Sequence, residues 1–97
     1  MEENKQEHIV YMLRCSDSSF YTGYTTDLEQ RVKKHEEGKG AKYTRGRGPF
    51  QVVYIEKHET KEAAMKREYA IKQLSRKEKV GLIREQLKEV MNHEGPK

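Results

Sequence analysis

Two short runs rich in β-branched and aromatic residues, separated by a polar turn, constrain the fold of this chain most strongly. Residues 8–14 (HIVYMLR) form the first run, residues 16–19 (SDSS) the turn, and residues 20–25 (FYTGYT) the second run. This arrangement predicts an antiparallel β-hairpin. Gly23, inside the second run, indicates either a bulge or a close approach of another group to the backbone.

Helix-start signals follow the hairpin directly. Thr26 and Glu29 fit a capping box, and Gly38 is a natural helix stop, so a first helix is expected up to about residue 37. After a basic, glycine-rich loop, residues 51–56 (QVVYIE) predict a third strand.

Two further helices are expected in the last third of the chain. Thr60 can cap a helix that runs to Leu74, and Ser75 with Glu78 forms a second capping box that opens the last helix. Four apolar residues in that helix have the spacing of a single core-facing stripe: Val80, Ile83, Leu87 and Val90. The predicted fold is α+β, in the order β-β-α-β-α-α, with a domain at 8–91 between disordered tails at 1–7 and 92–97.

The size and composition of the chain limit the classes of protein it can belong to. Its 97 residues are 33% hydrophobic and 37% charged, which allows one modest core. Cys15 is the only cysteine, so an internal disulfide is excluded. The polar N-terminus does not resemble a secretory signal, and no apolar run is long enough to span a membrane. We therefore expect a cytoplasmic protein with no membrane contact.

Positive charge is concentrated in one segment. Residues 31–47 carry a net charge of +5, whereas the whole chain carries +4. Such a block is typical of a protein that binds a polyanion, although a solvated loop has the same composition. The bases that we expect to contact nucleic acid lie in the glycine-rich loop, together with one tyrosine: Lys39, Lys42, Tyr43, Arg45 and Arg47.

Arg31 and His35 lie at the edge of the face that the first helix turns to the sheet, since Leu28 and Val32 mark its inward side. An arginine there needs an anion or a polar cleft. Alternatively, its aliphatic stem packs while its guanidinium reaches water.

Glu68 projects from the apolar stripe of the second helix, four residues after Ala64 and three before Ile71. A carboxylate in that position needs a partner, and a divalent cation is one candidate. The alternative is an ordinary ion pair with Lys72, one helical turn later, or with Arg67.

Tyrosines are frequent on the predicted strands. Tyr11 and Tyr21 flank the hairpin turn at comparable distances, so strand pairing could bring them together. Both could simply be structural. In the company of an arginine, a glutamate and a basic loop, a phenolate could instead act as a general base. That role requires a substantial lowering of the ordinary tyrosine pKa of about 10.

The order of these residues resembles the GIY-YIG nucleases, a superfamily that includes homing endonucleases, some restriction enzymes and the N-terminal nuclease domain of bacterial excision repair. The resemblance rests on Ile9-Val10-Tyr11, on Tyr21-Thr22-Gly23, on Arg31 eight residues later, on His35 and on Glu68. It covers about residues 8–85. Residues 40–47 (GAKYTRGR) look closer still to a subgroup of small, stand-alone bacterial proteins.

The resemblance implies a role for each matching residue. Tyr11 and Tyr21 would be the motif tyrosines, one of them the general base, and Gly23 the motif glycine near the nucleic acid. Arg31 would hold the scissile phosphate, and His35 would have either a supporting or a proton-transfer role. Glu68 would bind one divalent cation, Mg²⁺ or Mn²⁺. The implied fold is a three-stranded antiparallel sheet flanked by helices.

The match departs from the family pattern at a few positions. Thr22 stands where the motif has isoleucine, and the late asparagine of several members has no equivalent, because Asn4 and Asn92 lie near the ends. The implied function is a metal-dependent DNA endonuclease, structure-selective and linked to DNA repair or processing, with RNA still a possible substrate. The alternatives are a nucleic-acid-binding module with little catalysis and a protein-interaction adaptor that uses the third helix.

Overall fold

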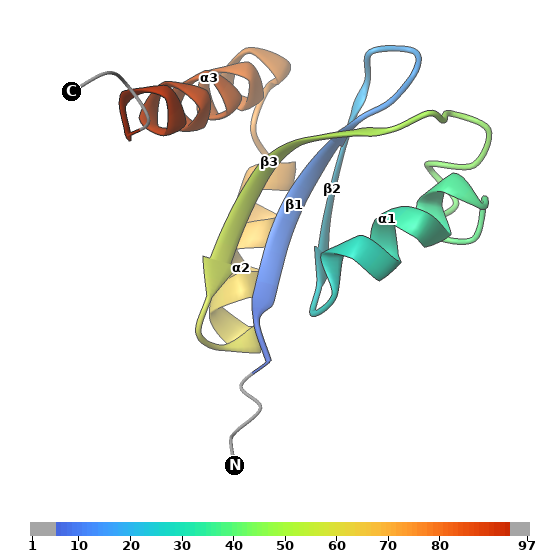
Figure 1. Cartoon of the computed structure of the whole chain (residues 1–97), viewed down its shortest axis with the longest axis horizontal. Coiled ribbons are helices and arrows are strands. Elements are labelled where there is room, and N and C mark those ends of the chain that lie inside the picture. The colour runs from blue at the N-terminus through green and yellow to red at the C-terminus, as the bar shows by residue number, and fades with distance from the viewer. Residues whose placement is uncertain (1–5, 94–97) are drawn as a thin grey trace.

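The computed structural model describes residues 6–93, and these contain one antiparallel sheet. Its strands are β1 (His8–Arg14), β2 (Phe20–Thr25) and β3 (Gln51–His58). The strand order is β2-β1-β3, so the predicted hairpin is confirmed and β1 is central (Figure 1). Tyr11 pairs with Gly23, and Leu13 with Tyr21, in a ladder without a bulge between β1 and β2.

Three helices complete the predicted order β-β-α-β-α-α. They are α1 (Leu28–Glu36), α2 (Lys61–Lys72) and α3 (Arg76–His93). Helix α2 lies against one face of the sheet, and α1 packs on the opposite face (Figure 1). The capping signals at Thr60 and Ser75 are confirmed. Thr60 accepts a hydrogen bond from the Ala63 backbone N–H, and Ser75 and Glu78 cap each other reciprocally.

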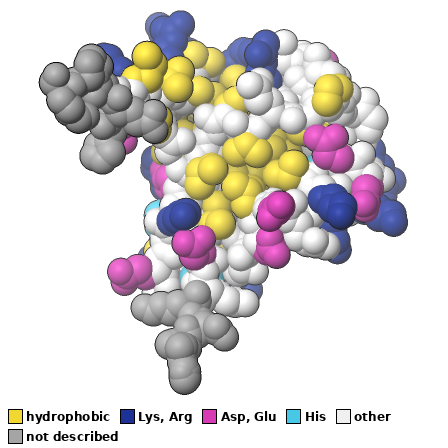
Figure 2. Space-filling view, viewed as in Figure 1, with side chains coloured by type: hydrophobic (Ala, Val, Ile, Leu, Met, Phe, Trp, Pro, Cys, Tyr) yellow, Lys and Arg dark blue, Asp and Glu magenta, His cyan; other side chains and the backbone are white. Residues whose placement is uncertain are grey.

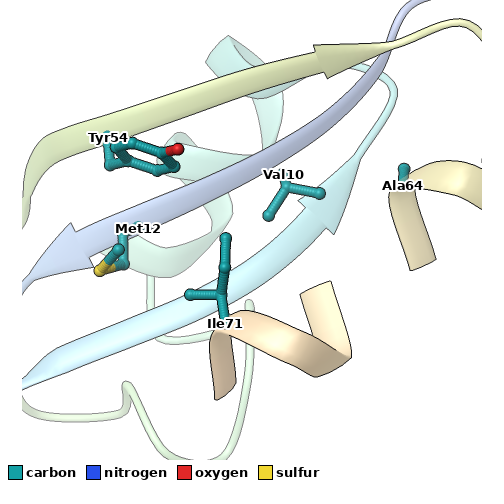
Figure 3. Close-up of a cluster of buried hydrophobic side chains, with 5 residues drawn as sticks. All are labelled: Val10, Met12, Tyr54, Ala64 and Ile71. Carbon is teal, nitrogen blue, oxygen red and sulfur yellow. The ribbon is translucent and has the colours of Figure 1, made fainter. Parts of the chain in front are cut away.

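The sheet buries apolar side chains on both faces, because alternate residues of β1 point in opposite directions. The face toward α2 holds one compact cluster: Val10, Met12, Tyr54, Ala64 and Ile71 (Figure 3). On the other face, Ile9, Tyr11 and Leu13 pack under Leu28 and Val32 of α1, as expected. This second cluster places Tyr11 next to the helix that carries Arg31 and His35.

The second face is covered only in part. Figure 2 shows hydrophobic side chains gathered on the surface over the sheet beside α1, with acidic and basic side chains around them. Val52 and Ile55 of β3 are only half-buried there.

The start of α1 differs from the prediction by one residue. The N-cap is Asp27, whose carboxylate accepts a hydrogen bond from the Gln30 backbone N–H at 3.1 Å. Thr25, the last residue of β2, accepts a hydrogen bond from the Asp27 backbone N–H at 3.0 Å. This bond tightens the turn between strand and helix, and the exposed Thr26 lies inside that turn rather than at the cap.

The prediction of a single core-facing stripe in α3 is wrong for its second half. Leu82 and Ile83 pack against the α2-side cluster. Leu87 is 57% exposed and Val90 47%, because α3 extends away from the sheet toward its C-terminal end (Figure 1). Gln86 makes paired hydrogen bonds to the backbone of Ile55 on the edge strand β3, at 2.6 and 3.1 Å.

Within residues 6–93, no helix has the length and apolarity needed to cross a membrane. The predicted tails, residues 1–7 and 92–97, fall mainly outside the described residues. Helix α3 continues through His93, beyond the predicted domain end at residue 91.

Candidate active site

A buried chain of hydrogen bonds connects the hairpin to α1 and to the glycine-rich loop. Tyr11 Oη lies 2.9 Å from His35 Nε2, and His35 Nδ1 lies 2.9 Å from Thr44 Oγ1. Thr44 in turn donates its hydroxyl proton to the Ala41 carbonyl at 3.0 Å. The exposed fractions of Tyr11, His35 and Thr44 are 1%, 1% and 0%. Side-chain packing and hydrogen bonding therefore hold the imidazole in one orientation.

These contacts fix the protonation pattern of the chain. Because the Thr44 hydroxyl proton is used on Ala41, Thr44 Oγ1 accepts the proton of His35 Nδ1. His35 Nε2 is then free to accept the hydrogen bond from the Tyr11 hydroxyl. Burial, with a smaller effect from the Arg31 guanidinium, lowers the pKa of His35, which favours this neutral imidazole.

Tyr11 is held in its neutral form. Burial raises the pKa of Tyr11 well above its ordinary value, and nearby Tyr21 and Glu68 raise it further, while Arg31 opposes the shift. Arg31 and Glu68, which come from α1 and α2, are thus both close enough to act electrostatically on the same hydroxyl. The structure thus brings Tyr11 and His35 into direct contact, with the charges of Arg31 and Glu68 acting on the Tyr11 hydroxyl. The catalytic role of these residues stays a prediction.

Two glycines make room for the buried chain. A Cβ at Gly23 would lie 2.5 Å from Tyr11 Oη, and one at Gly40 would lie under 3.0 Å from three ring atoms of His35. The predicted close approach at Gly23 is therefore real, and the approaching group is the Tyr11 side chain. Gly23 itself is buried, so it serves packing within the hairpin.

Tyr21 forms the outer wall of this site. Its ring centroid lies 6.3 Å from that of Tyr11, 5.2 Å from that of His35 and 6.0 Å from that of Tyr43. Unlike Tyr11, Tyr21 is only half-buried. The predicted proximity of the two strand tyrosines is confirmed, and of the two only Tyr21 presents surface to a ligand.

Glu68 is paired with Lys72, the alternative that the sequence left open. Glu68 Oε2 lies 3.0 Å from Lys72 Nζ, and the Glu68 side chain is 13% exposed. Arg67, the other possible partner, binds Glu56 instead, at 2.9 Å. Glu68 therefore already faces a cation in this structure.

The residues present fit a divalent ion held mainly from outside the protein. In the described part of the chain, no group of three histidine, cysteine or acidic side chains could enclose a metal. Mg²⁺ commonly binds through one or two carboxylates and completes its coordination with water and substrate phosphates. A single, mostly buried carboxylate matches that pattern, and an ion bound there would take the place of the Lys72 ammonium.

The basic loop provides both exposed and internally held bases. Lys39, Lys42 and Arg45 are exposed, as expected for residues that contact a polyanion. Arg47 lies at the surface but is bound by other residues of the protein. Its guanidinium pairs with Asp17, donates to the Tyr43 carbonyl at 2.6 Å and lies 4.5 Å from the centre of the Tyr43 ring.

Sequence reasoning missed Thr44 and Gly40 as parts of the site. Both fall in the GAKYTRGR segment, where Gly40 was one of several loop glycines. Thr44 contacts His35 only because the irregular loop folds back over α1, which no periodic pattern indicates. The side chain of Asn92 lies outside the described side chains.

Comparison with known proteins gives the chain a family. Residues 7–80 match the model of the GIY-YIG catalytic domain. The UPF0213 protein OB0043 of Oceanobacillus iheyensis is 62% identical over 78 residues, which cover 80% of this chain and 91% of that protein. A UPF0213 protein of Staphylococcus aureus is 54% identical over 78 residues, which cover 80% of this chain and 95% of that protein.

Two solved structures are also similar. The solution structure of UPF0213 protein BH0048 from Bacillus halodurans is 57% identical in sequence, with a TM-score of 0.53. The match covers 79% of this chain and 82% of that one. The solution structure of protein EF2693 from E. faecalis is 43% identical in sequence, with a TM-score of 0.57. The match covers 99% of this chain and 97% of that one. With residues 7–80 matching the family model and a curated relative 62% identical over 78 residues, the chain belongs to the GIY-YIG catalytic domain family.

Proposed function

We propose that this protein is a metal-dependent endonuclease that hydrolyses phosphodiester bonds in DNA, with a preference for particular DNA structures and a role in DNA repair or processing. The observation that carries the proposal is the packing of Tyr21 against the buried Tyr11–His35–Thr44 chain, in which the charges of Arg31 and Glu68 act on the Tyr11 hydroxyl. Cys15, the single cysteine, is compatible with action in the reducing cytoplasm.

Tyr21 is the better candidate for the general base. A base must reach the proton it removes, and its pKa must not be raised far above the working pH. Tyr11 fails on both counts, because it is 1% exposed and its pKa is raised by burial. Tyr21 is half-buried, and in its phenolate form it would accept a proton from the attacking water.

Tyr11 and His35 then act as positioning residues. Tyr11 donates to a neutral imidazole that Thr44 holds in place, so the two rings that contact Tyr21 cannot turn away from it. This arrangement leaves Tyr21 little freedom before substrate binds, which is the condition for an effective base.

Arg31 and Glu68 would act on the phosphate. The Arg31 guanidinium would offset the negative charge that builds up on the phosphate oxygens in the transition state. Glu68 would hold the divalent ion, Mg²⁺ or Mn²⁺, which supplies Lewis-acid activation of the phosphate and a bound water. Lys39, Lys42 and Arg45 would bind neighbouring phosphates, giving salt-sensitive affinity with little sequence preference.

A cleavage assay tests the proposal. Purified protein would be incubated with single-stranded, nicked, flap and branched DNA, and with matching RNA, in Mg²⁺ or Mn²⁺. Glu68→Gln would be compared with Glu62→Gln, which changes an exposed carboxylate six residues earlier on α2. We expect cleavage by the wild type and by Glu62→Gln, and none by Glu68→Gln.

Two results would contradict the proposal in different ways. Activity that survives in Glu68→Gln would remove this carboxylate from the mechanism. Salt-sensitive DNA binding without cleavage in either metal would instead identify a nucleic-acid-binding module on a nuclease scaffold.

A further inference from the structure

A pocket of about 350 Å³ opens beside the candidate active site, along the edge strand β2. Six residues from four parts of the fold line it: Phe20, Tyr21, Thr22, Tyr43, Lys72 and Lys79. Because β2 is an outer strand, side chains from both faces of the sheet reach this edge. The volume lies at the lower end of the range for small-molecule sites.

Two ammonium groups line the pocket, those of Lys72 and Lys79. Lys72 also pairs with Glu68 at 3.0 Å, so one wall of the pocket is the immediate neighbour of the candidate metal ligand. Lys79, from the first turns of α3, has no carboxylate within ion-pair distance among the described residues. A charged group without a protein partner beside a pocket favours an anionic ligand.

One of the residues that line the pocket, Thr22, carries an unsatisfied hydroxyl. Thr22 is 4% exposed, and its Oγ1 is the one buried side-chain polar atom in the described chain that has no hydrogen-bond partner. Buried polar groups are almost always paired, so an orphaned hydroxyl in a pocket wall needs an explanation. A phosphate oxygen that entered the pocket could accept its proton.

The remaining wall is aromatic. The Tyr21 and Tyr43 rings are stacked at an angle of 26°, and Tyr43 is 45% exposed. Aromatic side chains beside cationic groups are the usual platform for unpaired bases, because every base has a stackable face.

We propose that this pocket binds one unpaired nucleotide of the substrate, next to the phosphodiester that is cut. Lys72 and Lys79 pair with its phosphate, the Thr22 hydroxyl donates to the same group, and the base lies against the Tyr21–Tyr43 wall. This inference rests on the proposed nuclease function and adds a structural preference to it. A base in an intact duplex is stacked and paired on both sides, so only a flipped, flanking or single-stranded nucleotide can use the wall.

The test measures binding in EDTA, where no cleavage occurs. A short fluorescein-labelled single-stranded oligodeoxynucleotide and a blunt duplex of the same length are titrated with wild type, Tyr43→Leu and Lys79→Met, and anisotropy is recorded. Tyr69→Leu and Lys88→Met are matched controls, since both residues are exposed and lie outside the pocket. Amide spectra by NMR verify that each variant is folded.

We expect Tyr43→Leu to weaken single-strand binding about tenfold, the effect of one lost base–aromatic stack, and Lys79→Met to weaken it several-fold. Both controls and the duplex should change by less than about twofold. Tyr43→Phe keeps the ring and should bind like the wild type. An abasic oligonucleotide should abolish the difference between Tyr43→Leu and wild type.

Equal losses on single strand and duplex, or no loss in either variant, would overturn the pocket assignment. The result separates the two proposals. If the variants lose single-strand binding but the wild type never cuts DNA, the nucleotide site stands and the nuclease proposal falls. If the wild type cuts DNA and both variants bind single strands normally, the nuclease proposal stands and the nucleotide site falls.

Discussion

Tyr11 and His35 form a hydrogen bond of 2.9 Å, and each packs against a glycine at a position where no larger residue would fit. Gly23 lies against the Tyr11 hydroxyl, and Gly40 against the His35 ring. The hairpin, α1 and the basic loop therefore meet at one tightly packed contact. Distortion at any of these three elements should move the same pair of side chains.

Alanine at either glycine should destabilise the protein. In Gly23→Ala the new Cβ would lie 2.5 Å from Tyr11 Oη, and Tyr11 cannot retreat because it is buried against His35. Overpacking of this kind costs about 1–3 kcal/mol, and Gly40→Ala should cost a similar amount. The free energy of unfolding, from urea titration, measures the effect.

Gly81 gives the matched control. It lies inside α3, is exposed, and has open space where a Cβ would be. Gly81→Ala should therefore stabilise the protein by about 0.5–1 kcal/mol through helix propensity. If Gly23→Ala proved as harmless as Gly81→Ala, the tight contact at Tyr11 would not exist.

The two strand tyrosines should respond differently to loss of the hydroxyl. Tyr21→Phe should lower the rate of cleavage about 10²–10⁴-fold, the usual contribution of general base catalysis, with little change in stability. Tyr11→Phe should cost about 1 kcal/mol of stability, because it leaves the buried His35 Nε2 without a donor. Its effect on the rate should be smaller.

Single-turnover rates over a range of pH, together with urea unfolding, separate these effects. Tyr69→Phe, at an exposed tyrosine of α2, should match the wild type in both measurements. A larger rate loss in Tyr11→Phe than in Tyr21→Phe would reverse the assignment of the base.

The protein should lose stability as the pH falls below about 6.5, the ordinary histidine value. Burial lowers the pKa of His35 in the folded state, so the unfolded chain binds a proton more readily in this range. The contribution of His35 to the free energy of unfolding is complete above the pKa of this histidine in the unfolded chain. It is lost as the pH falls toward the lower pKa of His35 in the folded protein.

Other groups act in a different window. Burial alone would raise the pKa of Glu56, but hydrogen bonds from Tyr54, Arg67 and His58 outweigh it and lower that pKa. Stability from Glu56 is therefore present above its ordinary value of about 4.5 and lost below it. Urea unfolding between pH 5 and 7.5, with an NMR titration of the His35 ring, isolates the histidine. A His35 ring that titrates above its ordinary value would contradict this account.

The sequence predicted the elements whose signals are local. Alternating β formers around a polar turn placed the hairpin, and side chain to backbone capping placed the starts of α2 and α3 at Thr60 and Ser75. The same logic missed Asp27 by one residue, since Thr26 and Asp27 are both good caps and only the turn after Thr25 decides between them.

Contacts made by irregular segments could not be predicted in this way. The stripe in α3 shows which residues are apolar, but not whether the sheet is long enough to cover them, and Leu87 is exposed beyond its end. The burial of His35 depends on Thr44 in a loop with no periodic pattern. The pairing of Glu68 with Lys72 was one of the alternatives that the sequence left open, beside a divalent cation and a pair with Arg67.

Bases in the glycine-rich loop should differ in their effect on DNA binding. Lys42→Ala and Arg45→Ala remove exposed charges, and each should weaken binding and reduce the slope of log K against log salt by about one. Arg47→Ala should instead act mainly on stability, because Arg47 is held by Asp17 and the Tyr43 carbonyl. Salt-dependent anisotropy and thermal unfolding distinguish the two behaviours. A full unit of slope lost in Arg47→Ala with unchanged stability would show that this guanidinium binds phosphate.

Lys72 should compete with the divalent ion for Glu68. Its ammonium lies 3.0 Å from Glu68 Oε2, in the place where a cation bound to that carboxylate would sit. Lys72→Met removes the competing charge and leaves Glu68 mostly buried without a partner, so Mn²⁺ should bind this variant more tightly than the wild type.

Water-proton relaxation enhancement during Mn²⁺ titration measures this affinity without DNA or catalysis. Lys66→Met, an exposed lysine elsewhere on α2, is the control and should bind Mn²⁺ like the wild type. The double variant Glu68→Gln/Lys72→Met should lose the gain, because the gain requires the carboxylate. Equal affinity in Lys72→Met and wild type would show that the ion pair and the metal do not share Glu68, and it would move the metal site away from this residue.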